Sequence, residues 1–229
     1  MSSKIDYSLY LVTDRELMRA RSVEECVEQA VLGGCTVVQL REKKVSASEF
    51  YETALKLRKV TAHFGVPLII NDRADIAKAI DADGVHIGQG DLPYSAARGI
   101  VGNDKTVGVS VSCLAEALEA ARLGADYLGV GAMFATGTKT DADFTSMEEL
   151  LKIRKSVSLP IVVIGGINKE TVPLFFGTGI NGVAVVSAVV AHRDIAHAAK
   201  EIMAMIGAGA KFIARNPSPV EGALGLGPR

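Results

Sequence analysis

The chain has 229 residues, of which 48% are hydrophobic and 22% are charged, and its formal net charge is -1. This length and composition suit one large α/β domain, although two small domains are also compatible with them. The near-zero net charge gives no support to nucleic-acid binding or to electrostatic attachment to a membrane.

Short apolar strands alternate with amphipathic helices along the chain. The first unit is a strand over Leu9–Thr13 and a helix over Ser22–Leu32, in which Ser22 and Glu25 have the spacing of a capping box. The later strands are expected over residues 36–40, 68–70, 84–87, 106–110, 127–131, 161–164 and 182–186. The helices that follow them are expected over 46–64, 73–80, 93–101, 114–123, 146–157, 169–176 and 194–206.

Eight such units in roughly 200 residues predict a single (β/α)8 TIM barrel better than an open doubly wound sheet. The glycines in GGCTVV, GADYLG and GINGVA are expected to stop helices in a left-handed conformation before the next strand. The barrel domain is expected over residues 1–206. Residues 207–229 are rich in Gly, Ala and Pro without periodicity, and they are expected to form a flexible C-terminal tail.

The cysteines and the N-terminal segment bear on the cellular compartment. Cys26, Cys35 and Cys113 are an odd number at wide spacings, which favours reduced thiols over a disulfide framework or a zinc site. The N-terminus has no apolar signal-peptide core, and no run of about 18 apolar residues occurs. We therefore expect a cytoplasmic protein without a membrane span.

Polar side chains follow several predicted strands, and in a barrel these strand ends meet at one mouth. Arg41 and Lys43 follow the second strand and could clamp an anion, or stand in solvent without a ligand. Asp72 and Asp91 follow the third and fourth strands and could hold Mg²⁺ beside substrate phosphates. Capping of the next helix is the alternative for Asp72.

The segment 126–139, DYLGVGAMFATGTK, joins a predicted buried strand to a polar loop. Thr136, Thr138 and Lys139 offer two hydroxyls and an ammonium around a glycine, which suits phosphate binding. By itself, TGTK is more typical of an ordinary surface loop. Together with the two cations after the second strand, Lys139 favours a substrate that carries a diphosphate.

Two further features concern the mouth. Gly165 and Gly166 follow the seventh strand and Ser187 follows the eighth, where such barrels commonly bind phosphate through backbone N–H groups. His86 lies within the fourth strand among apolar neighbours, and we interpret it as a satisfied core residue rather than a base. The sequence therefore predicts no catalytic histidine.

The motifs QLREK, IIND, HIGQGD, GVS, TGTK, IGGI and VVSAV, in this order, resemble those of the thiamine-phosphate synthase family from Leu9 to about Ile206. The resemblance implies a Mg²⁺-dependent barrel that joins hydroxymethylpyrimidine diphosphate to thiazole phosphate, yielding thiamine phosphate and pyrophosphate. The expected partners are these small molecules, with no nucleic acid and no membrane, and a homo-oligomer is left open. Two alternatives stay open, namely a thiazole tautomerase-like barrel and a non-catalytic barrel that binds phosphate ligands.

The resemblance also assigns roles to residues. It implies diphosphate binding by Arg41, Lys43, Asn71 and Lys139, magnesium binding by Asp72 and Asp91, and contacts of Gln39 and Ser110 with the pyrimidine and its leaving group. It implies thiazole phosphate binding by Thr136, Thr138, Gly166, Val186 and Ser187. Because an electron-rich pyrimidine can lose diphosphate without a protein nucleophile, catalysis is expected to be charge stabilisation. The expected catalytic residues are Arg41, Lys43, Ser110 and Lys139.

Overall fold

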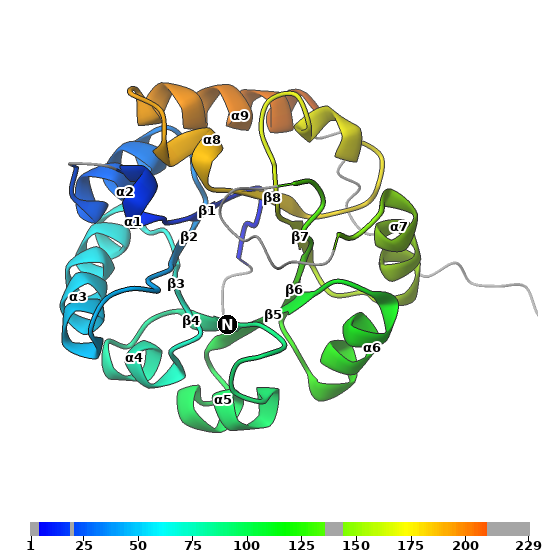
Figure 1. The fold of residues 1–229 in the computed structure, drawn as a ribbon, viewed down its shortest axis with the longest axis horizontal. Helices are drawn as coiled ribbons and strands as arrows, with labels where there is room; N and C mark the ends of the chain where they lie inside the picture. The colour runs from blue at the N-terminus through cyan, green and yellow to red at the C-terminus, as the bar shows by residue number, and fades with distance from the viewer. Residues whose placement is uncertain (1–4, 19–20, 136–143, 210–229) are drawn as a thin grey trace, which may run out of the picture.

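The computed structural model describes residues 5–18, 21–135 and 144–209. These residues form a closed barrel of eight parallel strands in sequence order, with the helices in a ring outside it (Figure 1). The last strand closes on the first in parallel register, with Leu9 opposite Val183. The predicted TIM barrel is confirmed.

The strands are short and almost entirely buried, because the helices cover their outer face and side chains fill the barrel on the inner face. This double burial explains why each strand is a nearly continuous apolar run in the sequence. The strands are β1 (Leu9–Val12), β2 (Val37–Leu40), β3 (Leu68–Asn71), β4 (Gly84–Ile87), β5 (Thr106–Val111), β6 (Tyr127–Val130), β7 (Ile161–Val163) and β8 (Gly182–Val185).

The outer ring consists of amphipathic helices whose apolar residues face the strands. They are α1 (Arg15–Met18), α2 (Val23–Leu32), α3 (Ala47–Phe64), α4 (Ala74–Ala79), α5 (Tyr94–Val101), α6 (Leu114–Leu123), α7 (Met147–Ser156), the 3₁₀ helix η1 (Val172–Phe175), α8 (Ser187–Val190) and α9 (Ile195–Gly209). No helix in the described ranges is long and apolar enough to cross a membrane.

Local signals predicted most helix ends. Ser22 Oγ accepts the Glu25 N–H at 3.1 Å, and the Glu25 carboxylate accepts the Ser22 N–H at 3.1 Å, so the capping box is present. In the three glycine phrases, φ is 109° at Gly34, 93° at Gly124 and 79° at Gly179, as expected, but Gly33, the C-cap residue of α2, has a φ of -77°.

The expected helix over residues 169–176 is wrong in type and extent, because only η1 forms there. The Asn168 side chain accepts N–H bonds from the next turn at 2.9 and 3.0 Å, and Pro173 has no N–H to donate. At the other end of the chain, α9 continues three residues past the expected barrel boundary at Ile206. The remainder of the expected tail, residues 210–229, lies outside the described residues.

The inside of the barrel holds an aromatic cluster rather than purely aliphatic layers. The Tyr127 ring centroid lies 4.8 Å from that of Tyr7 and 6.0 Å from that of Tyr10. A Cβ on Gly108 would lie 2.2 Å from the Tyr127 ring, so only glycine leaves room for that tyrosine. All three cysteines are free thiols; Cys26 and Cys35 are buried, whereas Cys113 is only half-buried.

Candidate active site

A cavity lies at the end of the barrel to which the carboxyl ends of the strands point, and residues from all eight described strands line it. Three of the expected site residues, Thr136, Thr138 and Lys139, lie outside the described residues. The other expected residues all line this one cavity, although they come from six different strand ends. They are Gln39, Arg41, Lys43, Asn71, Asp72, Asp91, Ser110, Gly166, Val186 and Ser187.

The exit of β2 carries the two cations of the rim. The backbone of Arg41 is fixed to the exit of β1, where its N–H donates to Thr13 Oγ1 at 2.9 Å. Among the described residues, the ion-pair partner of its guanidinium is a distant one, Asp14 Oδ2, at 4.0 Å. Lys43 Nζ donates to the Asp72 carboxylate, and its side chain is 48% exposed. Both cations therefore keep donors that a substrate could use.

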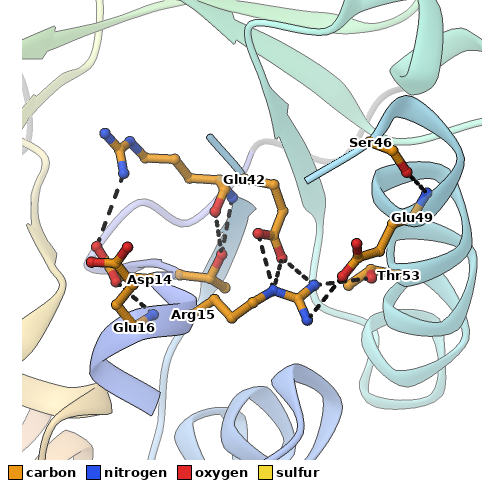
Figure 2. Close-up of polar contacts among 9 residues, drawn as sticks. Asp14, Arg15, Glu16, Glu42, Ser46, Glu49 and Thr53 are labelled. Atoms are coloured by element: carbon orange, nitrogen blue, oxygen red, sulfur yellow. Dashed lines mark hydrogen bonds and ion pairs between the residues drawn. The ribbon is translucent and has the colours of Figure 1, made fainter. Parts of the chain in front are cut away.

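Between these two cations, Glu42 faces the other way. Residues alternate in direction at a strand end, so Glu42 points toward the helices while its neighbours point to the cavity. Its side chain is 4% exposed, and Arg15 Nη2 and Nε donate to it at 2.7 and 3.1 Å. Arg15 also contacts Thr53 and Glu49 on α3 (Figure 2). This clamp ties the exit of β2 to α1 and α3.

Two carboxylates meet on the neighbouring part of the rim. Asp91 accepts the Gly88 N–H at 2.7 Å, and Asp72 lies close enough to affect its ionisation. Burial raises the pKa of Asp91, and the neighbouring Asp72 raises this pKa further. Asp72 has φ 63°, which places a non-glycine residue in the left-handed region.

The capping alternative for Asp72 finds no support in its contacts. The N-cap of α4 is Arg73, which makes no side-chain cap hydrogen bond. Among the described residues, no group of three or more His, Cys, Asp or Glu side chains could hold a metal. A metal at Asp72 and Asp91 would therefore have two protein carboxylates and would take its remaining ligands from substrate and water.

The opposite wall comes from β7 and β8, across the barrel from β3 and β4 (Figure 1). Gly165 and Gly166 have φ angles of 98° and 66°, and a Cβ on Gly166 would lie 2.7 Å from Phe134 Cβ. Val186 and Ser187 follow β8 at the start of α8. The two walls can thus face two separate anionic groups.

The floor contains three polar residues that sequence reasoning did not assign to the site. Tyr10, Tyr127 and His86 line the cavity and are hydrogen-bonded to one another and to Gln39 and Ser110. His86 is satisfied, as expected, but it also lies at the cavity. The available signal was weak, namely polar aromatic side chains inside strands that are otherwise apolar.

Comparisons with known proteins identify the family of the chain. The family model described as thiamine monophosphate synthase matches residues 9–189. A thiamine-phosphate synthase of Clostridium beijerinckii is 60% identical over 202 residues, covering 88% of this chain and 97% of the relative. One of Clostridium botulinum is 57% identical over 202 residues, covering 88% and 95%.

A solved structure gives the same result at the level of the fold. The thiamine phosphate pyrophosphorylase of Pyrococcus furiosus superposes with a TM-score of 0.83 at 40% identity, covering 90% of this chain and 98% of its own. The match of the family model, the near-complete alignment with curated relatives and the shared barrel lead to one conclusion. The chain belongs to the thiamine monophosphate synthase family.

Proposed function

We propose that this transferase makes thiamine phosphate by a dissociative route, in which pyrophosphate leaves the pyrimidine before the thiazole nitrogen attacks. The activity follows from the family, and the order of steps is our proposal. The observation that carries it is the grouping of Arg41 and Lys43 beside the two rim carboxylates in one cavity. Such a grouping suits stabilisation of a departing polyanion.

Arg41 and Lys43 would hold the diphosphate of the pyrimidine substrate. The 4.0 Å separation of Arg41 from Asp14 leaves its guanidinium free to form closer, bidentate bonds with phosphate oxygens. Lys43 would exchange its Asp72 partner for the substrate, or bridge the two. Asn71 at the end of β3 adds a neutral amide, and Lys139 from the TGTK motif is the proposed third cation.

The residues present fit a magnesium ion. Asp72 and Asp91 are neighbouring carboxylates that line one cavity, and their like charges repel unless a cation or a proton lies between them. Mg²⁺ commonly takes one or two carboxylates and completes its shell with phosphates and waters. When bound, Mg²⁺ would neutralise charge on the diphosphate.

The second anion would bind across the barrel. Gly166, Val186 and Ser187 line that wall, and we assign to them the phosphate of the thiazole substrate, together with Thr136 and Thr138. This separation would bring the thiazole ring between the two anion sites, close to the pyrimidine carbon. Two substrates held at fixed ends of one cavity gain much of their reactivity from orientation.

The two alternatives have less support. A tautomerase-like barrel would not need a diphosphate and magnesium set, yet Lys43, Asp72 and Asp91 lie together at the rim. A non-catalytic phosphate-binding barrel could use the same anion sites, so only turnover separates it from an enzyme. The cytoplasmic location and a homo-oligomeric state stay predictions.

The decisive experiment is incubation with both substrates and Mg²⁺, followed by mass spectrometry for thiamine phosphate and a pyrophosphatase-coupled phosphate assay for pyrophosphate. We expect product only when both substrates and the metal are present. Binding of either substrate without product would favour the non-catalytic barrel. Isomerisation of the thiazole alone, without the diphosphate substrate, would favour the tautomerase.

A further inference from the structure

Five polar side chains form a single file of hydrogen bonds across the floor of the cavity. Gln39 Nε2 lies 2.9 Å from Tyr10 Oη, and Tyr10 Oη lies 2.8 Å from Tyr127 Oη. Tyr127 Oη lies 2.8 Å from His86 Nδ1, and His86 Nε2 lies 2.8 Å from Ser110 Oγ. These residues come from β1, β2, β4, β5 and β6, so the file crosses the barrel.

The Gln39 side chain decides which group donates in each hydrogen bond of this file. The carboxamide nitrogen of Gln39 can only donate, so Tyr10 Oη accepts from it. Tyr10 is 2% exposed, and leaving a buried hydroxyl proton unpaired costs about 1–3 kcal/mol. Its proton therefore goes to Tyr127 Oη, and by the same reasoning the Tyr127 proton goes to His86 Nδ1.

The direction of donation decides which ring nitrogen of His86 bears the proton. A neutral histidine whose Nδ1 accepts a hydrogen bond carries its proton on Nε2. That Nε2–H then donates to Ser110 Oγ. Ser110 Oγ thus accepts a hydrogen bond from His86. The Ser110 hydroxyl proton can then point into the cavity that Ser110 lines.

We propose that His86 is a positioning residue that, with Tyr127, Tyr10 and Gln39, holds Ser110 as a hydrogen-bond donor aimed at the substrate. The inference rests on the proposed function for the identity of the acceptor, an oxygen of the departing diphosphate. A fixed donor stabilises charge that grows on such an oxygen, without reorganising during the reaction.

The same geometry excludes another role for the Ser110–His86 contact. A distance of 2.8 Å between a serine oxygen and a histidine nitrogen is also that of a nucleophile and its base. A base needs a free lone pair on the nitrogen that faces the serine, and here that nitrogen bears the proton. The contact therefore orients Ser110 and does not activate it.

The neighbouring strands leave space for the file. A Cβ on Gly129 would lie 2.9 Å from His86 Cε1, and a Cβ on Gly108 would lie 2.2 Å from Tyr127 Cζ. A side chain at either position would displace one of the two central members. The chain therefore has glycine on β5 and β6 at the places where the imidazole and the phenol must lie.

The first test reads the histidine directly. Long-range ¹H–¹⁵N correlation spectra of ¹⁵N-histidine-labelled protein, with His86 assigned by its loss in His86→Gln, report which ring nitrogen bears the proton. We expect neutral His86 with the proton on Nε2, in the absence of any substrate. A proton on Nδ1, or on both nitrogens at neutral pH, would overturn the proposal.

The second test uses turnover. His86→Leu removes the donor to Ser110 and should lower kcat about 10-fold with little change in KM, because the lost bond matters most in the transition state. His86→Gln, whose amide can still donate, should recover most of that loss. The exposed His63→Gln on α3 is the matched control and should keep wild-type kinetics. Equal losses in the Gln and Leu variants would contradict a positioning role.

The third test separates a donor from a nucleophile. Ser110→Ala should lower kcat about 10²-fold and still leave measurable turnover, as expected for a lost donor to developing charge. Complete loss, or a substrate fragment attached to Ser110 in intact mass spectra, would overturn the proposal. If the Nε2 tautomer is found but no thiamine phosphate forms, the proposed function fails while the direction of the file stands.

Discussion

The floor and the rim of the cavity hold polar groups in opposite ways. On the floor, Tyr10 and Tyr127 are 2% and 1% exposed, and each makes hydrogen bonds of 2.8 Å to other buried side chains. On the rim, Lys43 is 48% exposed, and Arg41 approaches its acidic partner only to 4.0 Å. The floor is a buried set of hydrogen-bonded side chains, whereas the rim carries partly exposed charges whose ion pairs face solvent.

This difference suits the rim and the floor to two different roles. A buried hydrogen-bonded file cannot rearrange without leaving a polar group unpaired, so it orients whatever it touches. Partly exposed ion pairs have small net energies and exchange readily with a better-placed anion. We therefore expect changes on the rim to affect substrate capture and changes on the floor to affect the chemical step.

The largest expected effect comes from the metal. Removing Mg²⁺ with a chelator should abolish thiamine phosphate formation, and Asp91→Asn should lower kcat/KM by about 10³-fold or more, because the diphosphate charge loses its neutralising partner. Product formation against magnesium concentration is the measurement. Asp75→Asn, an exposed carboxylate on α4, is the control and should behave as wild type. A wild-type magnesium curve for Asp91→Asn would show that the rim carboxylates do not hold the ion.

The second effect tests capture by the rim. Lys43→Gln should raise the KM for the pyrimidine diphosphate about 10²-fold, because one of the cations at the diphosphate is lost, and should leave the KM for thiazole phosphate nearly unchanged. Steady-state kinetics at low and high salt would measure both constants. The wild-type KM for the diphosphate should rise with salt more steeply than that of the variant. Equal changes in both constants would contradict the assignment of the two anions to opposite walls.

The rim was predictable from the sequence, as were Gln39 and Ser110 at the two ends of the floor, but the three residues between them were not. Arg41, Lys43, Asp72 and Asp91 are charged residues directly after apolar strands, and in a barrel such positions converge at one mouth. Tyr10, Tyr127 and His86 lie inside those strands, where a polar aromatic residue has the pattern of ordinary core. Whether two such residues meet depends on the tilt and register of the strands, which no local pattern reports.

The fold likewise has parts that the sequence predicted and a part that it did not. The strand and helix order was predictable because it follows from periodicity, and capping signals such as Ser22 set helix ends. The segment around η1 was not, because the Asn168 turn and Pro173 override an apparently helical pattern. Local chemistry that competes with periodicity is the main source of error here.

A smaller effect is expected from the clamp behind the rim. Glu42→Gln leaves Arg15 with a neutral partner, and since Glu42 is almost fully buried, the free energy of unfolding should fall by about 1–3 kcal/mol. The loosened exit of β2 should raise the KM for the diphosphate only a few-fold. Denaturant unfolding and kinetics measure both. Glu119→Gln, which breaks an exposed pair with Arg122, should change neither value. An unchanged stability for Glu42→Gln would contradict the clamp.

The smallest expected effect on turnover tests whether all buried tyrosines belong to the floor. Tyr7 packs on Tyr127 but does not line the cavity, so Tyr7→Phe should leave kcat and KM unchanged, whereas Tyr10→Phe interrupts the file and should lower kcat several-fold. Burial raises the pKa of Tyr7 above its ordinary value near 10, and the neighbouring Tyr10 and Asp126 add to this. The stability linked to neutral Tyr7 is therefore complete below about pH 10 and is lost as the pH rises, because the unfolded chain ionises first. Urea unfolding at pH 8 and pH 11 should show a smaller alkaline loss of stability for Tyr7→Phe than for wild type. A fall in kcat for Tyr7→Phe as large as that for Tyr10→Phe would show that the aromatic packing, and not the hydrogen-bond file, orients the floor.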